Sequence, residues 1–353
     1  MKEFLRMYMN KLFSHLLNML SCDLAIDLGS TNTLIYRSRK GIVINEPSMV
    51  AFRRRGSDCH DVVGVGNEAK ELIGRHFEDV MVVKPVRHGI IADFNAAGAM
   101  LRRYLERAAR SWHPASLRVI ATVPAQITTA DRDVVRNLIL SAGAKEVYLM
   151  EGPQAAALGA GVDISENHGT MVVDIGGGLT EMSVIVEGDV VSARTIRIGG
   201  EYVDRVITEH IQAQYNLVID GDTAERLKIQ MGRAHPCMDG ECVTVEGINI
   251  LTAREDSAQV ASHEICEVIS EPVNIIVKTI KNFVANLTPE IHVDVIDRGI
   301  TLAGGGALLP CVDQLLVQEL CLPVVVARNP LTCVVLGTGD ALNYLPLSRP
   351  DGL

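Results

Sequence analysis

The 353-residue chain lacks several features that would define its class. Its eight cysteines include no Cys-x-x-Cys pair, which argues against a zinc site or a disulfide framework and fits a reducing cytosol. No run of 18 apolar residues occurs, so no segment is expected to span a membrane. A formal charge of −10 argues against nucleic acid as the main partner. The length predicts roughly two domains.

One short pattern, by contrast, occurs twice. Residues 24–36 and 171–183 each contain an apolar run, an aspartate, a turn of small residues and a second apolar run. This order predicts a β-hairpin whose tip is too small to push a ligand away. Glycines let backbone N–H groups approach phosphate oxygens, and Asp27 and Asp174 can hold a hydrated Mg²⁺. The two hairpins, one per domain, predict a clamp for a nucleoside triphosphate, and a third glycine cluster at residues 303–306 supports it.

The first twenty residues carry a continuous apolar stripe at helical spacing. Lys2, Arg6 and Lys11 outweigh Glu3 on the other face. A helix packed on the protein's own core or on a partner would explain the stripe, but we favour a helix lying in the plane of an anionic membrane surface. The apolar residues are Phe4, Leu5, Tyr8, Met9, Leu12, Phe13, Leu16, Leu17 and Leu20.

The only tryptophan, Trp112, lies in a loop that is expected between a helix and a strand. A buried core aromatic is one explanation. An interfacial membrane anchor is the other, and the polar neighbours of Trp112 favour it, because indole prefers the level of the lipid headgroups.

Three strands followed by alternating helices and strands are expected in each half of the chain. The first three strands are predicted within residues 22–52, with a polar break at residues 53–61. A helix is predicted over residues 129–142, capped by Thr128 or Thr129. The repeated order predicts two related α/β domains with mixed sheets.

Several local motifs resemble one known family. They are Asp27-Leu-Gly-Ser-Thr-Asn-Thr-Leu-Ile-Tyr36, Asn45-Glu-Pro-Ser48, Ile91-Ala-Asp-Phe94, Asp174-Ile-Gly-Gly-Gly178, Arg197-Ile-Gly-Gly200, Thr223-Ala-Glu-Arg-Leu-Lys228, Leu302-Ala-Gly-Gly-Gly-Ala-Leu-Leu309 and Asn329-Pro-Leu-Thr-Cys333. Through them the chain resembles the bacterial actin-homologue family MreB, in the actin, Hsp70 and sugar-kinase superfamily. The resemblance extends from about residue 22 to about residue 345.

The resemblance implies an α/β, actin-like (RNase H-like) fold with two related domains and a nucleotide cleft between them. Mixed sheets flanked by helices are expected in both domains. Domain I would comprise residues 22–162 and 335–353, with a small insert at about 53–88. Domain II would comprise residues 163–334, with an insert at about 205–260, and residues 1–21 would form the amphipathic membrane helix.

The resemblance also implies the site, with ATP and Mg²⁺ as cofactors. Asp27 and Asp174 would organise Mg²⁺, largely through water. Glu225 and Lys228 would hold the ribose and adenine, although by themselves they would be better explained as a surface ion pair three residues apart on one helix face. The other implied nucleotide-binding residues are Ser30, Thr31 and Asn32 at the phosphates, Gly176, Gly177 and Gly178 around the β- and γ-phosphates, Arg226, and Gly305, Gly306, Ala307 and Leu308 as the adenosine floor.

Two positions depart from the family pattern. Gly152 stands where the family has a glutamate that positions the attacking water, and Leu179 stands where it has a threonine. Losing such a group typically costs roughly 100-fold or more in rate, so weak ATP hydrolysis is expected. Glu151, one residue before Gly152, or another residue could compensate through a small backbone shift.

The function implied by the resemblance is that of an ATP-binding, actin-like protein of cell-shape control. It would form filaments of paired protofilaments, attach peripherally to the anionic inner face of the cytoplasmic membrane, and guide cell-wall synthesis through membrane-embedded elongation proteins. A divergent paralogue that modulates other filaments is an alternative favoured by the two departures. A sugar kinase or phosphatase would need a general base that no motif supplies, and an Hsp70-type ATPase module would need a peptide-binding domain.

Overall fold

The computed structural model describes residues 22–55, 59–73, 79–109, 117–235 and 241–345. The chain forms two compact units. Unit 1 comprises the described parts of residues 1–123, 127–155 and 334–353, and unit 2 those of residues 124–126 and 156–333. The chain passes between the units within α5 (Gly152–Gly159) and at the start of α11 (Cys333–Ala341).

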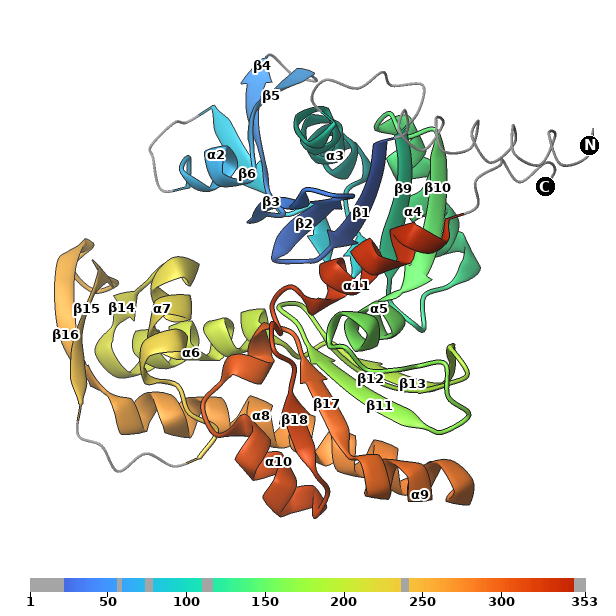
Figure 1. Cartoon of the computed structure of the whole chain (residues 1–353). Helices are drawn as coiled ribbons and strands as arrows, with labels where there is room; N and C mark the ends of the chain where they lie inside the picture. Colours follow the sequence, from blue (N-terminus) through green and yellow to red (C-terminus); the bar gives the residue numbers. More distant parts are fainter. Residues whose placement is uncertain (1–21, 56–58, 74–78, 110–116, 236–240, 346–353) are drawn as a thin grey trace, which may run out of the picture. The chain divides into compact units, whose positions relative to one another are not determined.

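Unit 1 is built on a five-stranded mixed sheet in the order β10-β9-β1-β2-β3 (Figure 1). The antiparallel pairs are β1–β2 and β2–β3, whereas β9 and β10 join the sheet in parallel. The strands are β1 (Cys22–Leu28), β2 (Asn32–Arg37), β3 (Gly41–Pro47), β9 (Leu117–Val123) and β10 (Glu146–Glu151).

Alternating side chains of this sheet enter two separate cores. Leu24 and Ile26 of β1 pack in the main core with apolar residues of α3 (Phe94–Ala108) and α4 (Thr129–Ser141), whereas Ala25 packs with Leu342 in a smaller cluster. Leu342 begins the short 3₁₀ helix η3 (Leu342–Tyr344). The side chains of Asp93 and Thr128 cap α3 and α4, so Thr128 is the cap of the helix predicted near residue 129.

A smaller sheet in the order β5-β4-β6 follows β3 in unit 1. It corrects the expected polar break at residues 53–61, because β4 and β5 pair there and set Arg53 opposite Asp61. Arg53 also forms an ion pair with Asp79 at 3.2 Å. The charged side chains in this part of β4 and β5 interrupt the alternation of apolar and polar residues from which a strand is predicted. The elements are β4 (Val50–Arg55), β5 (Cys59–Val65), α2 (Asn67–Lys70), β6 (Val80–Val83), and the separate hairpin β7 (Val86–Arg87) and β8 (Ile90–Ile91).

Unit 2 repeats the sheet of unit 1 strand for strand, in the order β13-β12-β11-β17-β18 (Figure 1). The first three strands are antiparallel neighbours, and the last two join β11 in parallel. The predicted pair of related mixed sheets is therefore present. The strands are β11 (Thr170–Ile175), β12 (Thr180–Val186), β13 (Asp189–Ile196), β17 (Ile300–Ala303) and β18 (Val324–Val326).

One face of this second sheet packs on the helices α8, α9 and α10, whose apolar residues share a core with β11 and β17. A second core joins α6 and α7 to a three-stranded sheet in the order β14-β15-β16. Within the described ranges, no helix has both the length and the apolar content needed to cross a membrane. The elements are α6 (Gly200–Tyr215), β14 (Leu217–Val218), α7 (Gly221–Met231), β15 (Cys242–Asn249), β16 (Arg254–Ala261), α8 (Ser262–Ala285), α9 (Pro289–Arg298), η2 (Gly305–Leu308) and α10 (Val312–Leu320).

Candidate functional site

The first aspartate hairpin joins β1 to β2 through Gly29, Ser30 and Thr31. A Cβ atom on Gly29 would lie 2.6 Å from the carbonyl oxygen of Asn32, so this tip requires glycine. Ser48, which is fully buried, holds the tip from the end of β3. Its hydroxyl donates to the Gly29 carbonyl oxygen at 2.6 Å, and its N–H donates to the Thr31 carbonyl oxygen at 2.8 Å. The backbone of the tip is therefore held in place by the protein itself.

The three residues predicted at the phosphates have different surroundings. Ser30 is buried, and its hydroxyl oxygen accepts a hydrogen bond at 3.1 Å from the N–H of Gly89, in the turn between β7 and β8. A hydroxyl that accepts this bond keeps its own proton for donation to an anion. Thr31 is half-buried and Asn32 is exposed.

Asp27 stands near the end of β1, beside the tip. Burial raises the pKa of its carboxyl group from 3.8 to about 6, and a hydrogen bond from the Thr122 hydroxyl at 3.3 Å partly offsets this increase. A carboxylate that is costly to ionise in a protein cavity is stabilised by a cation, because opposite charge favours the ionised form. Asp27 therefore suits a position next to a metal ion.

Replacing Asp27 by asparagine is expected to stabilise the ligand-free protein at neutral pH. The folded protein holds the Asp27 proton more tightly than the unfolded chain, so the contribution of Asp27 to the free energy of unfolding decreases as pH rises from about 4 to about 6 and then levels off. The Asp27→Asn variant lacks this decrease. Urea unfolding of both proteins at pH 4, 5 and 7, without nucleotide or Mg²⁺, measures the difference. A difference that does not change with pH would contradict the assignment.

The second aspartate hairpin joins β11 to β12 through three glycines and Leu179. The N–H of Gly176 donates to the Leu179 carbonyl oxygen at 2.9 Å, which closes the turn. The N–H of Gly200 donates to the Gly176 carbonyl oxygen at 3.0 Å. A Cβ atom on Gly199 would lie 2.4 Å from the Gly176 carbonyl oxygen and 2.7 Å from that of Gly177. The start of α6 thus packs backbone against backbone on the glycine turn.

The third glycine cluster lies directly beside Asp174. Strand β17 pairs in parallel with β11, which sets Ala303 opposite Asp174. Gly304 follows with a φ of +78°, and a Cβ atom there would lie 2.2 Å from the Asp174 carboxylate oxygen Oδ1. A Cβ atom on Gly306 would lie 2.2 Å from Cγ2 of Ile175. Glycine is required at both positions because the end of β11 occupies the space that a side chain would need.

The predicted residues of α7 are linked to the start of α6. Lys228 forms an ion pair with Asp204 at 2.7 Å and donates to the Gly200 carbonyl oxygen at 3.3 Å. Burial raises the pKa of the Asp204 carboxyl group, Lys228 lowers it, and the nearby Glu225 raises it. Glu225 and Lys228 therefore lie around one half-buried carboxylate, as expected for residues on one helix face. Arg226 is exposed.

The candidate catalytic residue Glu151 is held within unit 1. Its carboxylate forms an ion pair with Arg132 of α4, and its backbone N–H donates to the side-chain oxygen of Gln154 at 3.1 Å. Its neighbour Gly152 offers no side chain. The ion pair directs one carboxylate oxygen of Glu151 toward Arg132.

The donor groups fit Mg²⁺ better than a metal held entirely by protein. In the part of the chain that the structure describes, no group of three or more His, Cys, Asp or Glu side chains could hold a metal ion. Mg²⁺ usually keeps several waters and binds through one or two carboxylates plus substrate phosphates. Asp27 in unit 1 and Asp174 in unit 2 stand at the same position of their sheets, and each is a carboxylate of that kind.

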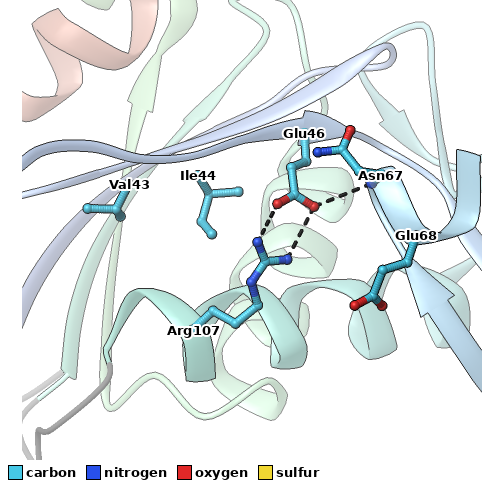
Figure 2. A pocket seen from close by; sticks show the side chains of 6 residues that line it. All are labelled: Val43, Ile44, Glu46, Asn67, Glu68 and Arg107. Atoms are coloured by element: carbon cyan, nitrogen blue, oxygen red, sulfur yellow. Dashed lines mark hydrogen bonds and ion pairs between the residues drawn. The ribbon is translucent and has the colours of Figure 1, made fainter.

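A separate cavity of about 510 Å³ in unit 1 contains none of the predicted nucleotide ligands (Figure 2). Its main polar feature is Glu46, which is 9% exposed and forms a two-pronged ion pair with Arg107. A Cβ atom on Gly66 would lie 2.2 Å from the Glu46 carboxylate oxygen Oε2, and Gly66 has a φ of +60°. The lining residues are Val43, Ile44, Glu46, Asn67, Glu68 and Arg107.

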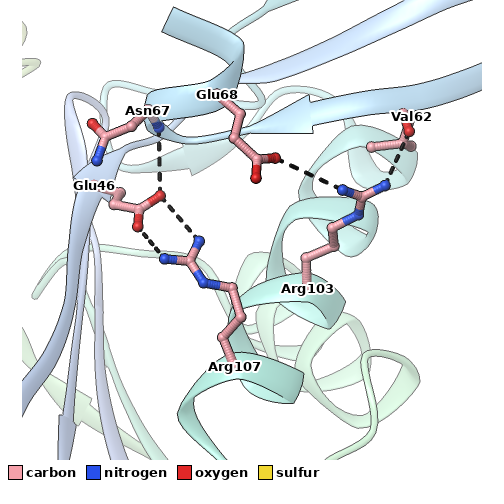
Figure 3. Close-up of polar contacts among 6 residues, drawn as sticks. All are labelled: Glu46, Val62, Asn67, Glu68, Arg103 and Arg107. Atoms are coloured by element: carbon pink, nitrogen blue, oxygen red, sulfur yellow. Dashed lines mark hydrogen bonds and ion pairs between the residues drawn. The ribbon is translucent and has the colours of Figure 1, made fainter.

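Figure 3 shows a second ion pair one helical turn away along α3, between Arg103 and Glu68 at 3.8 Å. Arg103 also donates to the Val62 carbonyl oxygen at 3.0 Å, and the N–H of Asn67 donates to Glu46 at 3.4 Å. These contacts fasten the small sheet and α2 to β3 and α3, so the cavity lies within a structural junction.

The predicted residues thus form one group in each unit. Unit 1 holds Asp27, Ser30, Thr31, Asn32 and Glu151, and unit 2 holds the others that the structure describes. Phe4, Leu5, Leu12, Phe13, Leu16, Leu17 and Trp112 lie outside the described residues. Ser48, Gly89, Thr122, Asp204 and Gly304 support the site but were missed as site residues, although Ser48 and Gly304 stand in motifs that carried the resemblance.

Residues 21–348 match a family model described as MreB/Mbl protein. The cell shape-determining protein MreB of Escherichia coli (strain K12) is 41% identical over 335 residues, which cover 94% of this chain and 96% of that protein. The cell shape-determining protein Mbl of Bacillus subtilis (strain 168) is 38% identical over 331 residues, covering 93% and 98%.

Solved structures agree with this similarity. A crystal structure of MreB5 of Spiroplasma citri bound to AMPPNP has a TM-score of 0.86 and 30% identity, covering 92% of this chain and 96% of that one. The ADP-bound structure of MreB5 has the same TM-score and identity. The MamK double helical filament has a TM-score of 0.75 at 19% identity, which supports the actin-like fold alone.

Proposed function

The chain belongs to the MreB/Mbl family of cell shape-determining proteins, and on this premise we propose that it is an ATP-binding, actin-like protein that forms membrane-associated filaments, controls cell shape and guides cell-wall synthesis. The observation that carries nucleotide binding is the duplicated sheet, in which an aspartate near the end of the first strand adjoins a small-residue turn. Asp27 and Asp174 are the two aspartates.

Nucleotide binding has two further supports. The backbone of both turns is held by contacts within its own unit, so little conformational entropy remains to be lost when phosphates bind. MreB5 of Spiroplasma citri, which is 30% identical, has been solved with AMPPNP and with ADP. We propose that Ser30, Thr31 and Asn32 contact phosphates, as do Gly176, Gly177 and Gly178. Glu225, Arg226 and Lys228 would contact the nucleoside together with Gly305, Gly306, Ala307 and Leu308 of the segment that follows β17.

Electron microscopy of the purified protein on anionic liposomes tests the proposed assembly. Filaments are expected with ATP and Mg²⁺, and are expected to be absent when nucleotide is removed. Paired protofilaments, attachment to the inner face of the cytoplasmic membrane and contact with membrane-embedded elongation proteins follow from the family resemblance. A protein that binds ATP but shows no filaments on or off liposomes would contradict self-assembly.

The proposed membrane attachment rests on the sequence pattern of residues 1–20. Changing Leu12 and Leu16 together to glutamate is expected to release the protein from anionic liposomes, with an affinity loss of about 100-fold. Each leucine contributes at least about 1.5 kcal/mol on full burial, and about 1.4 kcal/mol corresponds to tenfold in affinity. Co-sedimentation with liposomes measures the loss.

The matched control for this change is Asn10→Glu with Ser14→Glu. It adds the same charge at the same spacing to the polar positions of the pattern, so most binding should remain. Salt should weaken binding by the unmodified protein only in part, because apolar burial is not screened. Equal release by the two double variants would show that charge alone, and not the apolar stripe, decides attachment.

A second candidate function is the modulation of filaments built by another MreB. The ion pair between Glu151 and Arg132, together with the lack of a polar side chain at Gly152 and Leu179, favours slow hydrolysis. A slowly hydrolysing subunit would stabilise a mixed filament. Filaments formed by this protein alone would favour the first candidate, whereas incorporation only into filaments of a second MreB would favour the modulator.

A further inference from the structure

Glu181, which the predicted site does not include, is a buried carboxylate on the second aspartate hairpin. It is 6% exposed, and glutamate is almost never so deeply buried unless it is paired. In the antiparallel pair of β11 and β12, Glu181 lies directly opposite Asp174. Directly opposed residues project from the same face of a sheet, with Cβ atoms about 4.5–5.5 Å apart. Glu181 and Asp174 therefore form a pair of neighbouring acids beside the glycine turn.

The carboxylate of Glu181 is held by the segment that follows β9. The N–H of Ala125 donates to its oxygen Oε1 at 3.1 Å. The next residue, Gln126, donates through its side-chain nitrogen to the Ala193 carbonyl oxygen of β13 at 2.7 Å, which attaches the segment to the same sheet. The bond from Ala125 therefore fixes the direction of the Glu181 oxygen Oε1 beside β12.

The other residues near the usual water-positioning places are apolar or have partners elsewhere. Gly152 and Leu179 carry no polar side chain. The Thr180 hydroxyl donates to the Ile198 carbonyl oxygen at 2.7 Å, and Thr180 faces the side of the sheet opposite to its neighbour Glu181. Glu151 is held in the ion pair with Arg132.

We propose that Glu181 positions the water molecule that attacks the γ-phosphorus of bound ATP; this rests on the proposed nucleotide binding. The Glu181 carboxylate accepts a hydrogen bond from the water molecule. This bond directs a lone pair of the water oxygen at the γ-phosphorus. The bond between the water oxygen and the γ-phosphorus forms as the bond between the γ-phosphorus and the bridging oxygen breaks. The electron pair of the broken bond leaves with ADP. Both protons of the water leave on inorganic phosphate as H₂PO₄⁻, so ATP⁴⁻ and water give ADP³⁻ and H₂PO₄⁻. Glu181 takes no proton in this step.

The Glu181→Gln variant tests this role, because its amide oxygen can still accept the bond from Ala125 while the negative charge is lost. Phosphate release in a single turnover, at equal polymer mass, is expected to decrease about 100-fold. ATP affinity by calorimetry should change by less than about threefold. The control Asp189→Asn removes one negative charge from an exposed position on the neighbouring strand and should leave phosphate release unchanged.

A purely structural Glu181 would give a different result, namely unchanged phosphate release by a Glu181→Gln variant that binds ATP. That outcome overturns the proposal, as does an unmodified protein that binds ATP but releases no phosphate. If the Glu181→Gln variant fails to bind ADP, the Glu181→Asp variant decides, because it keeps the negative charge on a side chain that is one methylene shorter. This variant is expected to bind nucleotide but to lose phosphate release. Phosphate release at the rate of the unmodified protein would overturn the proposal. Absence of ATP binding by the unmodified protein would contradict the proposed function instead.

Discussion

Asp174→Ala is expected to weaken binding of ATP·Mg²⁺ by about 10–100-fold while leaving the protein folded. The carboxylate of Asp174 lies at the end of β11, beside the glycine turn and Gly304, where it can hold Mg²⁺ through water. Removing a group that orients a metal ion through one intervening ligand typically lowers metal affinity by about 10–100-fold. Calorimetric titration with ATP in the presence and absence of Mg²⁺ distinguishes a loss of Mg²⁺ affinity from a loss of affinity for the nucleotide itself.

Asp189→Ala provides the matched control for this change, because it removes an exposed carboxylate from the same sheet. It should bind ATP·Mg²⁺ with the affinity of the unmodified protein. Without Mg²⁺, the two variants should bind ATP similarly, since the nucleotide contacts of the glycines remain. Unchanged ATP·Mg²⁺ affinity in a folded Asp174→Ala variant would show that Asp174 does not organise the metal.

Gly304→Ala is expected to lower the free energy of unfolding by about 2–6 kcal/mol and to abolish nucleotide binding. The φ of +78° and ψ of 168° at Gly304 belong to a region that is essentially restricted to glycine and costs other residues about 1–3 kcal/mol. The added methyl group would also meet Asp174 Oδ1 and the Ile175 carbonyl oxygen, at 2.2 and 2.4 Å, and overpacking of this kind costs about 1–3 kcal/mol.

Urea unfolding monitored by circular dichroism measures the stability loss, and calorimetry measures nucleotide affinity. Gly221→Ala is the control, because a Cβ atom there meets nothing within 4 Å and its φ is ordinary. It should be neutral or slightly stabilising. Wild-type stability in Gly304→Ala would mean that the strand ends of β11 and β17 separate at little cost, and that Gly304 does not hold the position of Asp174.

The aspartate hairpins could be predicted because each is a local feature. The apolar run, the aspartate and the small turn of residues 24–36 lie within one hairpin, and so do those of residues 171–183. The same reasoning failed for residues 53–61, where β4 and β5 pair although they carry charged side chains. The alternation of apolar and polar residues identifies a strand only where one face of the strand is buried. The charged parts of β4 and β5 therefore lack this signal.

The supporting contacts of the site could not be predicted in the same way. Ser30 accepts a hydrogen bond from Gly89, 59 positions away, and Glu181 accepts one from Ala125, 56 positions away. Lys228 was predicted as a nucleotide ligand, yet it is also tied to Asp204 and Gly200. Nothing in the local sequence around these residues indicates which partner they meet.

The sequence by itself determined the two aspartate hairpins, the duplicated order of strands and helices, and the family to which the chain belongs. The hairpins and the order of elements depend on periodicity and turn chemistry, which act between residues close together in the chain, whereas the family follows from the resemblance of its local motifs. Only the tertiary structure decided that Ser48 holds the first tip, that Gly304 adjoins Asp174, and that Glu151 is paired whereas Glu181 is held beside Asp174. The physical reason is that hydrogen bonds and ion pairs act over only a few ångströms, so distant segments must first be packed together before their side chains can select partners.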